Sequence, residues 1–248
     1  MKRVRLLISY DGTNYCGWQI QINGVTVEEV LNKALTELLG EEIHVIGASR
    51  TDSGVHAYGN VAVFDTETKI PSDKICFALN QRLPDDIRIQ KSDEVPMDWH
   101  PRFQDSVKTY EYRILNRRFP DPMRRLYTHF VYMPLDVEKM KEACRYIVGE
   151  HDFASFCSAG SQVLSTVRTV YTLEVEKVGD EITIQISGNG FLYNMVRIIA
   201  GTLLKVGLGV YPPEHIKEII EAKDRYAAGP KAPARGLSLM EIKYREKD

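Results

Sequence analysis

The stretch IHVIGASRTDSGVHAYGNVAVF, residues 43–64, runs from an apolar segment through a short polar loop into an alternating segment. The apolar run Ile43–Ile46 predicts one strand, and Val61–Phe64 lies in the next. Between them, small and polar residues surround one base, Arg50, and one acid, Asp52. A carboxylate on a tight loop between two strands is held rigidly and stays accessible. The stretch therefore predicts a sheet-containing protein with a candidate catalytic acid at Asp52.

The same order of elements occurs twice along the chain. In the first copy, Thr26 and Glu29 form a capping box and Gly40 ends the helix; in the second, Asp136 caps a helix that we expect to stop at Gly149. The expected elements are a strand at 4–9, a helix at 26–40, strands at 43–48 and 59–66, a helix at 72–82 and a strand from 87, and then a strand at 109–114, a helix at 136–149, strands at 166–177 and 181–187, helices at 191–206 and 213–223, and a strand at 237–244.

Each copy reads βαββαβ, the ferredoxin-like order, so the fold class is α+β. We expect two halves, 1–104 and 105–248, to share a broad, mostly antiparallel sheet with helices behind it and a central cleft. The boundary is placed where the repeat restarts. Sheets of this kind bind RNA in other proteins, but a fold alone does not decide function.

Composition is that of an ordinary globular protein. Of the 248 residues, 44% are hydrophobic and 27% are charged, and the formal net charge is −2. Arg197 interrupts the longest apolar stretch, which argues against a transmembrane segment. Met1–Arg5 leads straight into a strand without a signal-peptide core, so we expect a cytoplasmic protein. The four cysteines, at 16, 76, 144 and 157, have no metal-ligand spacing and are expected to be reduced structural thiols.

Asp52 and Arg197 each allow two interpretations. Most loop aspartates bond nearby backbone amides, and Arg50 could be an ordinary surface arginine. Arg197 lies in a helix that is apolar on nearly every face, where an unpaired guanidinium would be very costly. It needs an anion, which could be a core carboxylate in a structural salt bridge or a substrate phosphate. If the anion is Asp52, the pairing would keep that acid ionised.

Aromatic and basic segments leave further alternatives open. Tyr110 and Tyr112 point the same way from one strand, either into the core or toward an unpaired base on which one ring could stack. Residues 11–19 are sufficiently explained by a hairpin, and 99–103 could be a linker or a basic wall of the cleft. The four arginines in 117–125 face only Asp121 in the sequence. They suggest a solvated loop, unless the same cleft also holds the acid.

Together these segments resemble the TruA family of tRNA pseudouridine synthases. The matching stretches follow the family's order and span essentially the whole chain: YDGTNYCGWQIQ (10–21), ASRTDSGVHA (48–57), NQRLPDDI (80–87), HPRF (100–103), KTYEYRI (108–114), GEHDFASF (149–156), TVRTV (166–170), GFLYNMVR (190–197) and ARGLSLMEI (234–242). One departure is Ser49, where many members have Gly; a Ser fits unless the backbone there needs positive φ.

The resemblance implies a role for each matching residue. Asp52 would be the essential catalytic carboxylate, and Arg197 would pair with it. Arg50 would enter the RNA and help to hold the place of the flipped nucleotide, Tyr110 would stack on the target uracil, and Leu237 would line the base pocket. The family acts as a homodimer on uridines on the 3′ side of the tRNA anticodon stem-loop, at positions 38, 39 and 40. The C-terminal half is the expected dimer interface.

The implied reaction is chemically coherent with this sequence. Isomerising uridine consumes neither electrons nor water, so no cofactor or metal is expected. Two rivals remain: a non-catalytic RNA-binding module on the same fold, which gives Asp52 no role, and an Asp-dependent nucleoside or glycoside hydrolase. The hydrolase usually needs a second carboxylate near the first, and the sequence does not show one.

Overall fold

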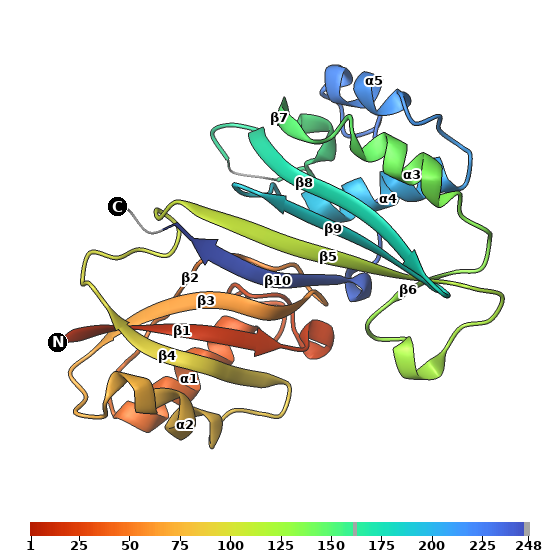
Figure 1. The fold of residues 1–248 in the computed structure, drawn as a ribbon. Helices are drawn as coiled ribbons and strands as arrows, with labels where there is room; N and C mark the ends of the chain where they lie inside the picture. Colours follow the sequence, from red (N-terminus) through yellow and green to blue (C-terminus); the bar gives the residue numbers. More distant parts are fainter. Residues whose placement is uncertain (161–162, 246–248) are drawn as a thin grey trace. The chain divides into compact units, whose positions relative to one another are not determined.

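The computed structural model describes residues 1–160 and 163–245. The chain divides into two compact units, Met1–Ser106 with Leu239–Asp248, and Val107–Ser238 (Figure 1). Each unit has its own strands and its own helices. The candidate acid Asp52 lies in the first unit, whereas Arg197, Tyr110 and Leu237 lie in the second.

The first unit is built on antiparallel strands. Strand β1 pairs with both β3 and β4, and the short β2 pairs with β3. The strand order is β4-β1-β3-β10. Its elements are β1 (Lys2–Tyr10), the 3-10 turn η1 (Gly12–Asn14), α1 (Val27–Leu39), β2 (Ile46–Gly47), β3 (His56–Thr66), the 3-10 turn η2 (Ser72–Lys74), α2 (Ile75–Asn80), β4 (Ile87–Val95) and, from Leu239 on, β10 (Leu237–Tyr244).

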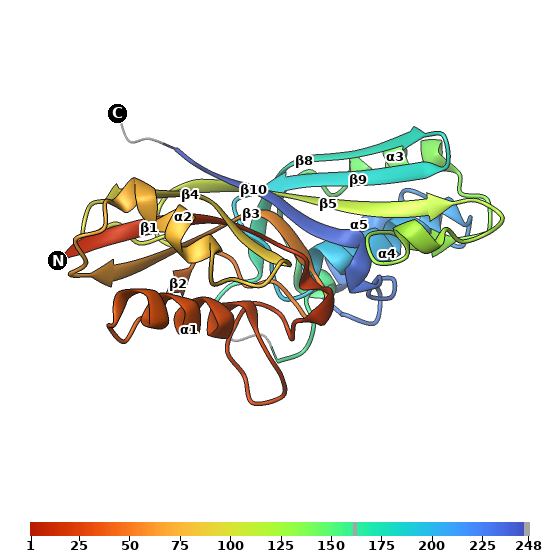
Figure 2. The ribbon, with the colours of Figure 1, turned by 90° about the horizontal axis from the view of Figure 1, so that it is seen from below.

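Helix α1 lies against one face of these strands (Figure 2). Leu31 and Leu35 of α1 are fully buried, as are alternate residues of β1, beginning with Val4 and Leu6. The side chain of Thr26 accepts a hydrogen bond from the Glu29 N–H, and Gly40 ends the helix with a φ of 69°. The predicted cap and stop of this helix are therefore confirmed, and they fix where the chain enters the segment leading to β2.

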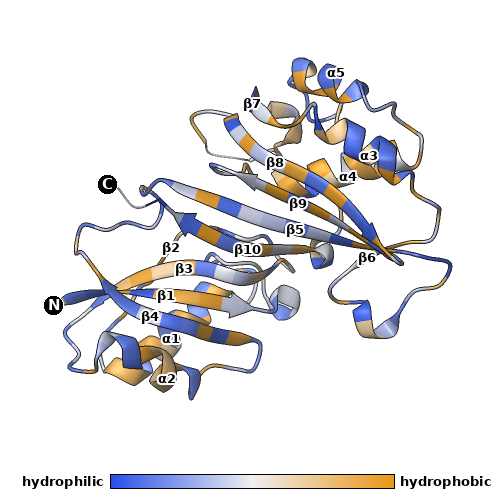
Figure 3. Ribbon diagram, viewed as in Figure 1, coloured by the Kyte–Doolittle hydropathy of each residue, from blue (hydrophilic) through white to orange (hydrophobic). Residues whose placement is uncertain are grey.

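The second unit has the strand order β5-β9-β8-β7, all neighbours antiparallel, with β6 parallel to β5. Polar and apolar residues alternate along β8 (Figure 3), as expected for a strand with one buried face. The elements are β5 (Ser106–Asn116), η3 (Pro122–Arg124), β6 (His129–Val131), α3 (Val137–Cys144), β7 (Gly149–Asp152), η4 (Ala154–Phe156), β8 (Val167–Val178), β9 (Glu181–Gly188), α4 (Met195–Gly207), α5 (His215–Ala222) and η5 (Ala234–Gly236).

The α+β class and the mostly antiparallel strands are confirmed. Some bounds were wrong. The strand expected at 43–48 is only the two-residue β2, and the helix expected from 191 begins at Met195, because Asn194 at its N-cap adopts a left-handed conformation with φ 60°. Helix α3 ends at Cys144, five residues before the stop expected at Gly149, and Gly149 instead opens β7. The sequence predicted neither β7 nor β6. The division at 104/105 and the central cleft stay predictions.

Within the described residues, no helix is both long and apolar enough to cross a membrane. The four cysteines are free thiols, and burial raises the pKa of Cys144 to about 12. In the same part of the chain, no group of three or more His, Cys, Asp or Glu side chains is placed to hold a metal ion. The expectation of a cofactor-free reaction stays a prediction.

Candidate active site

The loop that carries Asp52 joins β2 to β3 and alternates between buried and accessible residues. Ser49 and Thr51 are 8% and 7% exposed. Arg50, between them, is exposed, and Asp52 is partly exposed. Because its two neighbours point inward, the side chain of Arg50 must project outward. Ser49 has no positive φ, so this backbone does not require the glycine found in many family members.

A buried polar network lies beneath this loop. The hydroxyl of Tyr10 lies 2.8 Å from Oγ1 of Thr51. The side-chain amide of Asn60 donates to the carbonyl oxygen of Ser49 at 3.0 Å and to the Tyr10 hydroxyl at 3.3 Å. Its Oδ1 accepts the N–H of Val61 at 2.9 Å. Residues at the end of β1 and in β3 therefore fix the backbone that leads to Asp52.

The segment 11–18 also packs against this loop. The N–H of Trp18 donates to the carbonyl oxygen of Thr51 at 3.0 Å, and both the N–H of Gly54 and the hydroxyl of Ser53 donate to the carbonyl oxygen of Tyr15, at 3.3 and 3.2 Å. The hairpin expected for 11–19 is wrong, because the segment forms the 3-10 turn η1 and contains no strand. The local sequence pattern did not indicate that this segment lies beside the candidate acid.

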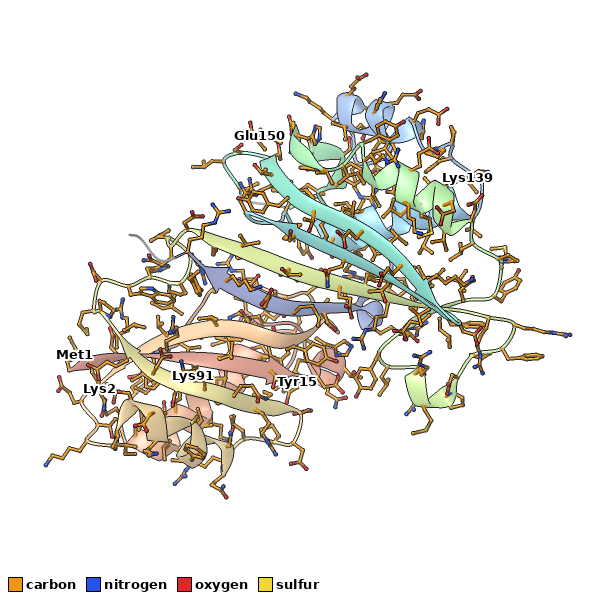
Figure 4. The ribbon with its side chains drawn as sticks, in the orientation of Figure 1. Met1, Lys2, Tyr15, Lys91, Lys139 and Glu150 are labelled. Atoms are coloured by element: carbon orange, nitrogen blue, oxygen red, sulfur yellow. The ribbon has the colours of Figure 1, made fainter. Side chains whose placement is uncertain are left out.

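A contact with a third segment holds this turn. Tyr15, which lies beyond the end of β1 (Figure 4), donates its hydroxyl to Oδ1 of Asp86 at 2.6 Å. The backbone N–H of Asp11 donates to the carbonyl oxygen of Asp86 at 2.9 Å. Burial raises the pKa of the Tyr15 hydroxyl, and the bond to Asp86 raises it further. The tyrosine therefore stays protonated and acts as a donor in this turn.

Two cations lie on or beside the loop in the first unit, Arg50 and Arg102. Nε of Arg102 donates to the carbonyl oxygen of Gly47 at 2.7 Å. Burial lowers the pKa of Arg102, and the positive charge of Arg50 lowers it further, against an opposing effect of Glu28. In residues 1–160 and 163–245 neither arginine forms an ion pair with a carboxylate within 4.0 Å. Arg102 is thus attached to the last residue of β2, where the loop begins, and its charge lies near that of Arg50.

The ring next to Arg102 is unusually accessible. Phe103 is 82% exposed and stacks on His100, with the ring centroids 4.1 Å apart and the planes 18° from parallel. Burial lowers the pKa of His100, and the charges of Arg102 and Arg3 act in the same direction. The His100 ring is therefore neutral near pH 7. A flat, accessible pair of rings beside a cation is a surface on which a nucleic-acid base can stack.

In the second unit, Arg197 is 9% exposed, and two of its hydrogen bonds are to neutral oxygens. Its Nε donates to the carbonyl oxygen of Ala232 at 2.8 Å, and its Nη1 donates to Oδ1 of Asn194 at 3.0 Å. Asn194 is itself fixed, since its Nδ2 donates to the hydroxyl of Ser158 at 3.0 Å. These bonds orient the guanidinium.

The remaining predicted residues of this unit are buried. Tyr110 is 6% exposed and packs edge-on against Phe191, with centroids 5.3 Å apart. Tyr112 is fully buried and donates its hydroxyl to the carbonyl oxygen of Pro233 at 2.9 Å. Burial raises the pKa of Tyr112. Leu237 is 5% exposed. Tyr112 is thus a core residue, and the roles predicted for Tyr110 and Leu237 stay predictions.

The basic segment 117–125 has more acidic neighbours than the sequence indicated. Arg117 lies 3.7 Å from a carboxylate oxygen of Asp180, and Arg124 pairs with Glu181. Asp180 lies in the turn between β8 and β9, and Glu181 is the first residue of β9, about 60 residues away along the chain. The expectation that these arginines face only Asp121 was wrong, since the β8–β9 hairpin supplies two further carboxylates.

Comparison with known proteins gives the family. A family model described as tRNA pseudouridine synthase matches residues 6–104 and 143–245. Curated relatives named tRNA pseudouridine synthase A are similar over nearly all of both chains. The protein of Ruminiclostridium cellulolyticum is 52% identical over 245 residues, and those of Thermoanaerobacter sp. and Brevibacillus brevis are each 51% identical over 244 residues; each alignment covers 98% of this chain and 100% of the relative.

The chain belongs to the tRNA pseudouridine synthase family. The synthase is therefore an isomerase that converts uridine to pseudouridine in tRNA. The matched ranges include the Asp52 loop, the segment 11–18 and Arg102 in one unit, and Arg197 with Asn194 in the other.

Proposed function

We propose that this synthase isomerises uridines on the 3′ side of the tRNA anticodon stem-loop, with Asp52 as the catalytic carboxylate. The observation that supports the proposal most directly is the place of Asp52. It is partly exposed on a loop that is fixed from beneath by Tyr10 and Asn60 and from the side by Trp18. A reactive group on a rigid support is held in its working geometry without further ordering.

The chemistry needs one ionised carboxylate and follows one of two routes. In the first, a carboxylate oxygen bonds to C1′, and uracil leaves with the electron pair of the N1–C1′ bond. The freed base turns, C5 bonds to C1′, the carboxylate leaves, and C5 loses its proton. In the second, the carboxylate removes the C2′ proton as the base departs, and returns it after C5 has bonded to C1′. Both routes end with a proton on N1 and consume no cofactor.

Arg197 is proposed as the counter-ion of Asp52. Arg197 is 9% exposed, and a buried guanidinium is stabilised strongly by a nearby anion. The pairing would favour the ionised form of Asp52 in a site from which bound RNA excludes water. It would also counter the negative charge that returns to the carboxylate when the product forms.

Base flipping is the third part of the proposal. A nucleotide in a stem-loop must leave its stack to be reached, at a cost of a few kcal/mol. The exposed Arg50 would enter the vacated position, and Arg102 would contact the RNA backbone beside it. Tyr110 would stack on the extruded uracil, and Leu237 would line its pocket. We further propose that the synthase acts in the cytoplasm as a homodimer formed through residues 105–248.

The deciding experiment compares wild-type protein with Asp52→Asn, which keeps the size and shape of the side chain and removes its charge. Pseudouridine formation on an anticodon stem-loop RNA is measured together with RNA affinity. We expect product formation to vanish and binding to persist. A mutant that turns over at the wild-type rate would remove Asp52 from the mechanism, and release of free uracil by the wild type would favour a hydrolase instead.

A further inference from the structure

We propose that Tyr10 and Asn60 are positioning residues for the reaction, acting through Thr51 and Ser49 on the loop that carries Asp52. The inference rests on the proposed catalytic role of Asp52. Neither residue touches the reacting atoms in this scheme. Tyr10 instead holds the side-chain hydroxyl of Thr51, and Asn60 holds the carbonyl oxygen of Ser49, on the segment that leads to Asp52.

The network lies at the point where the loop leaves the sheet. The β2–β3 ladder pairs Gly47 with Ala62, and the N–H of Ala48 still donates to the carbonyl oxygen of Val61 at 2.7 Å. Beyond Ala48, side-chain hydrogen bonds replace the backbone hydrogen bonds of the ladder. Asn60 accepts the N–H of Val61 with its own Oδ1 and donates with its Nδ2 to the carbonyl oxygen of Ser49. The loop can therefore diverge from β3 without leaving these buried groups unpaired.

The network holds the residues on both sides of Arg50. Ser49 is bonded through its carbonyl oxygen and Thr51 through its hydroxyl, and the two bonds meet at Tyr10 and Asn60. Tyr10 is 4% exposed and Asn60 is fully buried. Because bonded groups in a buried site have little freedom to shift, the directions of Arg50 and Asp52 are set from below.

Removing one hydroxyl from this network should displace the Asp52 carboxylate without creating a large cavity. Tyr10→Phe deletes the hydroxyl that joins Thr51 to Asn60 and keeps the ring in place. Thr51→Val removes the hydroxyl of Thr51 at almost constant volume, and Thr51→Ser restores it. A shift of about 1 Å in a reacting group can cost on the order of a hundredfold in rate. RNA affinity depends mainly on charges that these variants keep.

The control is Tyr244→Phe in the same unit. Tyr244 donates its hydroxyl to the carbonyl oxygen of Pro101 at 3.1 Å, so the variant loses one partly buried hydrogen bond. Tyr10→Phe loses two, to Thr51 and to Asn60. It does not touch the Asp52 loop network. Because it loses one hydrogen bond rather than two, its loss of stability should be about 1 kcal/mol smaller than that of Tyr10→Phe.

The experiment measures kcat and KM on a stem-loop RNA for wild type and the four variants, with unfolding curves to show that each is folded. We expect Tyr10→Phe and Thr51→Val to lower kcat by about tenfold to a hundredfold with KM changed less than about threefold. Thr51→Ser should recover most of the rate, and Tyr244→Phe should keep kcat near wild type.

Two results would overturn the inference: a kcat for Tyr10→Phe and Thr51→Val equal to that of Tyr244→Phe, or a loss confined to KM. Asp52→Asn is assayed in parallel. If Asp52→Asn is inactive while Tyr10→Phe and Thr51→Val are fully active, only the positioning role fails. If Asp52→Asn is itself active, the proposed catalytic role fails.

Discussion

The backbone N–H of Trp18 donates to the carbonyl oxygen of Thr51 at 3.0 Å, so the residue before the candidate catalytic acid is held by a turn that precedes it by more than 30 positions. The two motifs 10–21 and 48–57 are therefore packed together in the structure. Gly17, next to Trp18, has a φ of +84°, and a Cβ built on it would lie 2.6 Å from the same carbonyl oxygen of Thr51. Close approach and backbone conformation both exclude a side chain there.

Gly17→Ala should therefore destabilise the protein more than Gly40→Ala does. Both positions have positive φ, which costs an alanine roughly 1 to 2 kcal/mol, but nothing lies within 4 Å of a Cβ on Gly40. Only Gly17→Ala must also push the Asp52 loop away, so we expect an additional loss of at least about 1 kcal/mol and a lower kcat. Urea unfolding and turnover on a stem-loop RNA test this. Equal effects of the two substitutions would show that the approach of Gly17 to Thr51 does not constrain the loop.

Arg102→Ala should weaken RNA binding in a salt-dependent way. The guanidinium is anchored by Gly47, lies beside Arg50 and has no carboxylate ion pair among the described residues. If it contacts one phosphate, its loss should reduce the slope of log K against log salt by about 1. The measurement is a titration of RNA at several salt concentrations. The control is Arg82→Ala, which removes an exposed arginine just beyond α2 that donates to the carbonyl oxygen of Ala78 in that helix. A slope unchanged by Arg102→Ala would contradict the phosphate contact.

His129→Phe should remove part of the pH dependence of stability. Burial lowers the pKa of His129 to about 4, and the charge of Arg235 acts in the same direction. An unfolded histidine has a pKa of about 6.5. Above pH 6.5 His129 is therefore neutral in both the folded and the unfolded chain, and its contribution to stability is fully present. It is lost progressively as the pH falls from 6.5 toward 4, because the unfolded chain then binds a proton that the folded chain does not, at a cost of up to about 3 kcal/mol.

The phenylalanine keeps the edge-on contact with Tyr112, whose ring centroid lies 6.4 Å away. It also removes a buried Nδ1 that has no hydrogen-bond partner in the described part of the chain. We expect the variant to be about as stable as wild type at pH 7 and more stable at pH 5. Unfolding curves at the two pH values test this. The prediction is disproved if the difference in unfolding free energy between wild type and variant is the same at both pH values.

Local signals in the sequence predicted the elements whose ends are set by local chemistry. Thr26 and Gly40 bound α1 as expected, and β10 has the bounds that its alternation indicated. The short strands β6 and β7 were missed, because three or four residues carry too little periodicity to be recognised. The helix after Phe191 was predicted to begin too early, since no local sequence feature indicates the left-handed conformation of Asn194.

The candidate site was predictable only in part. A polar loop between two strands indicated Asp52 and Arg50, and an arginine in an apolar helix indicated Arg197. The contacts that hold them were not predictable, because they join distant positions. Asn60 is bonded to Ser49 and Tyr10 across a sheet, and Arg102 reaches Gly47 over 55 residues. The catalytic, stacking and pocket roles of Asp52, Tyr110 and Leu237 stay predictions.

The left-handed backbone of Asn194 limits which sequences can evolve at this position. Its φ of 60° penalises most side chains, while its amide oxygen must still reach Arg197. Glycine would satisfy the backbone but not the arginine, and glutamine could supply an amide but not the conformation. Asparagine, and aspartate with an added charge, meet both demands. Directed evolution of this synthase should therefore rarely accept any other residue at 194 unless position 197 changes at the same time.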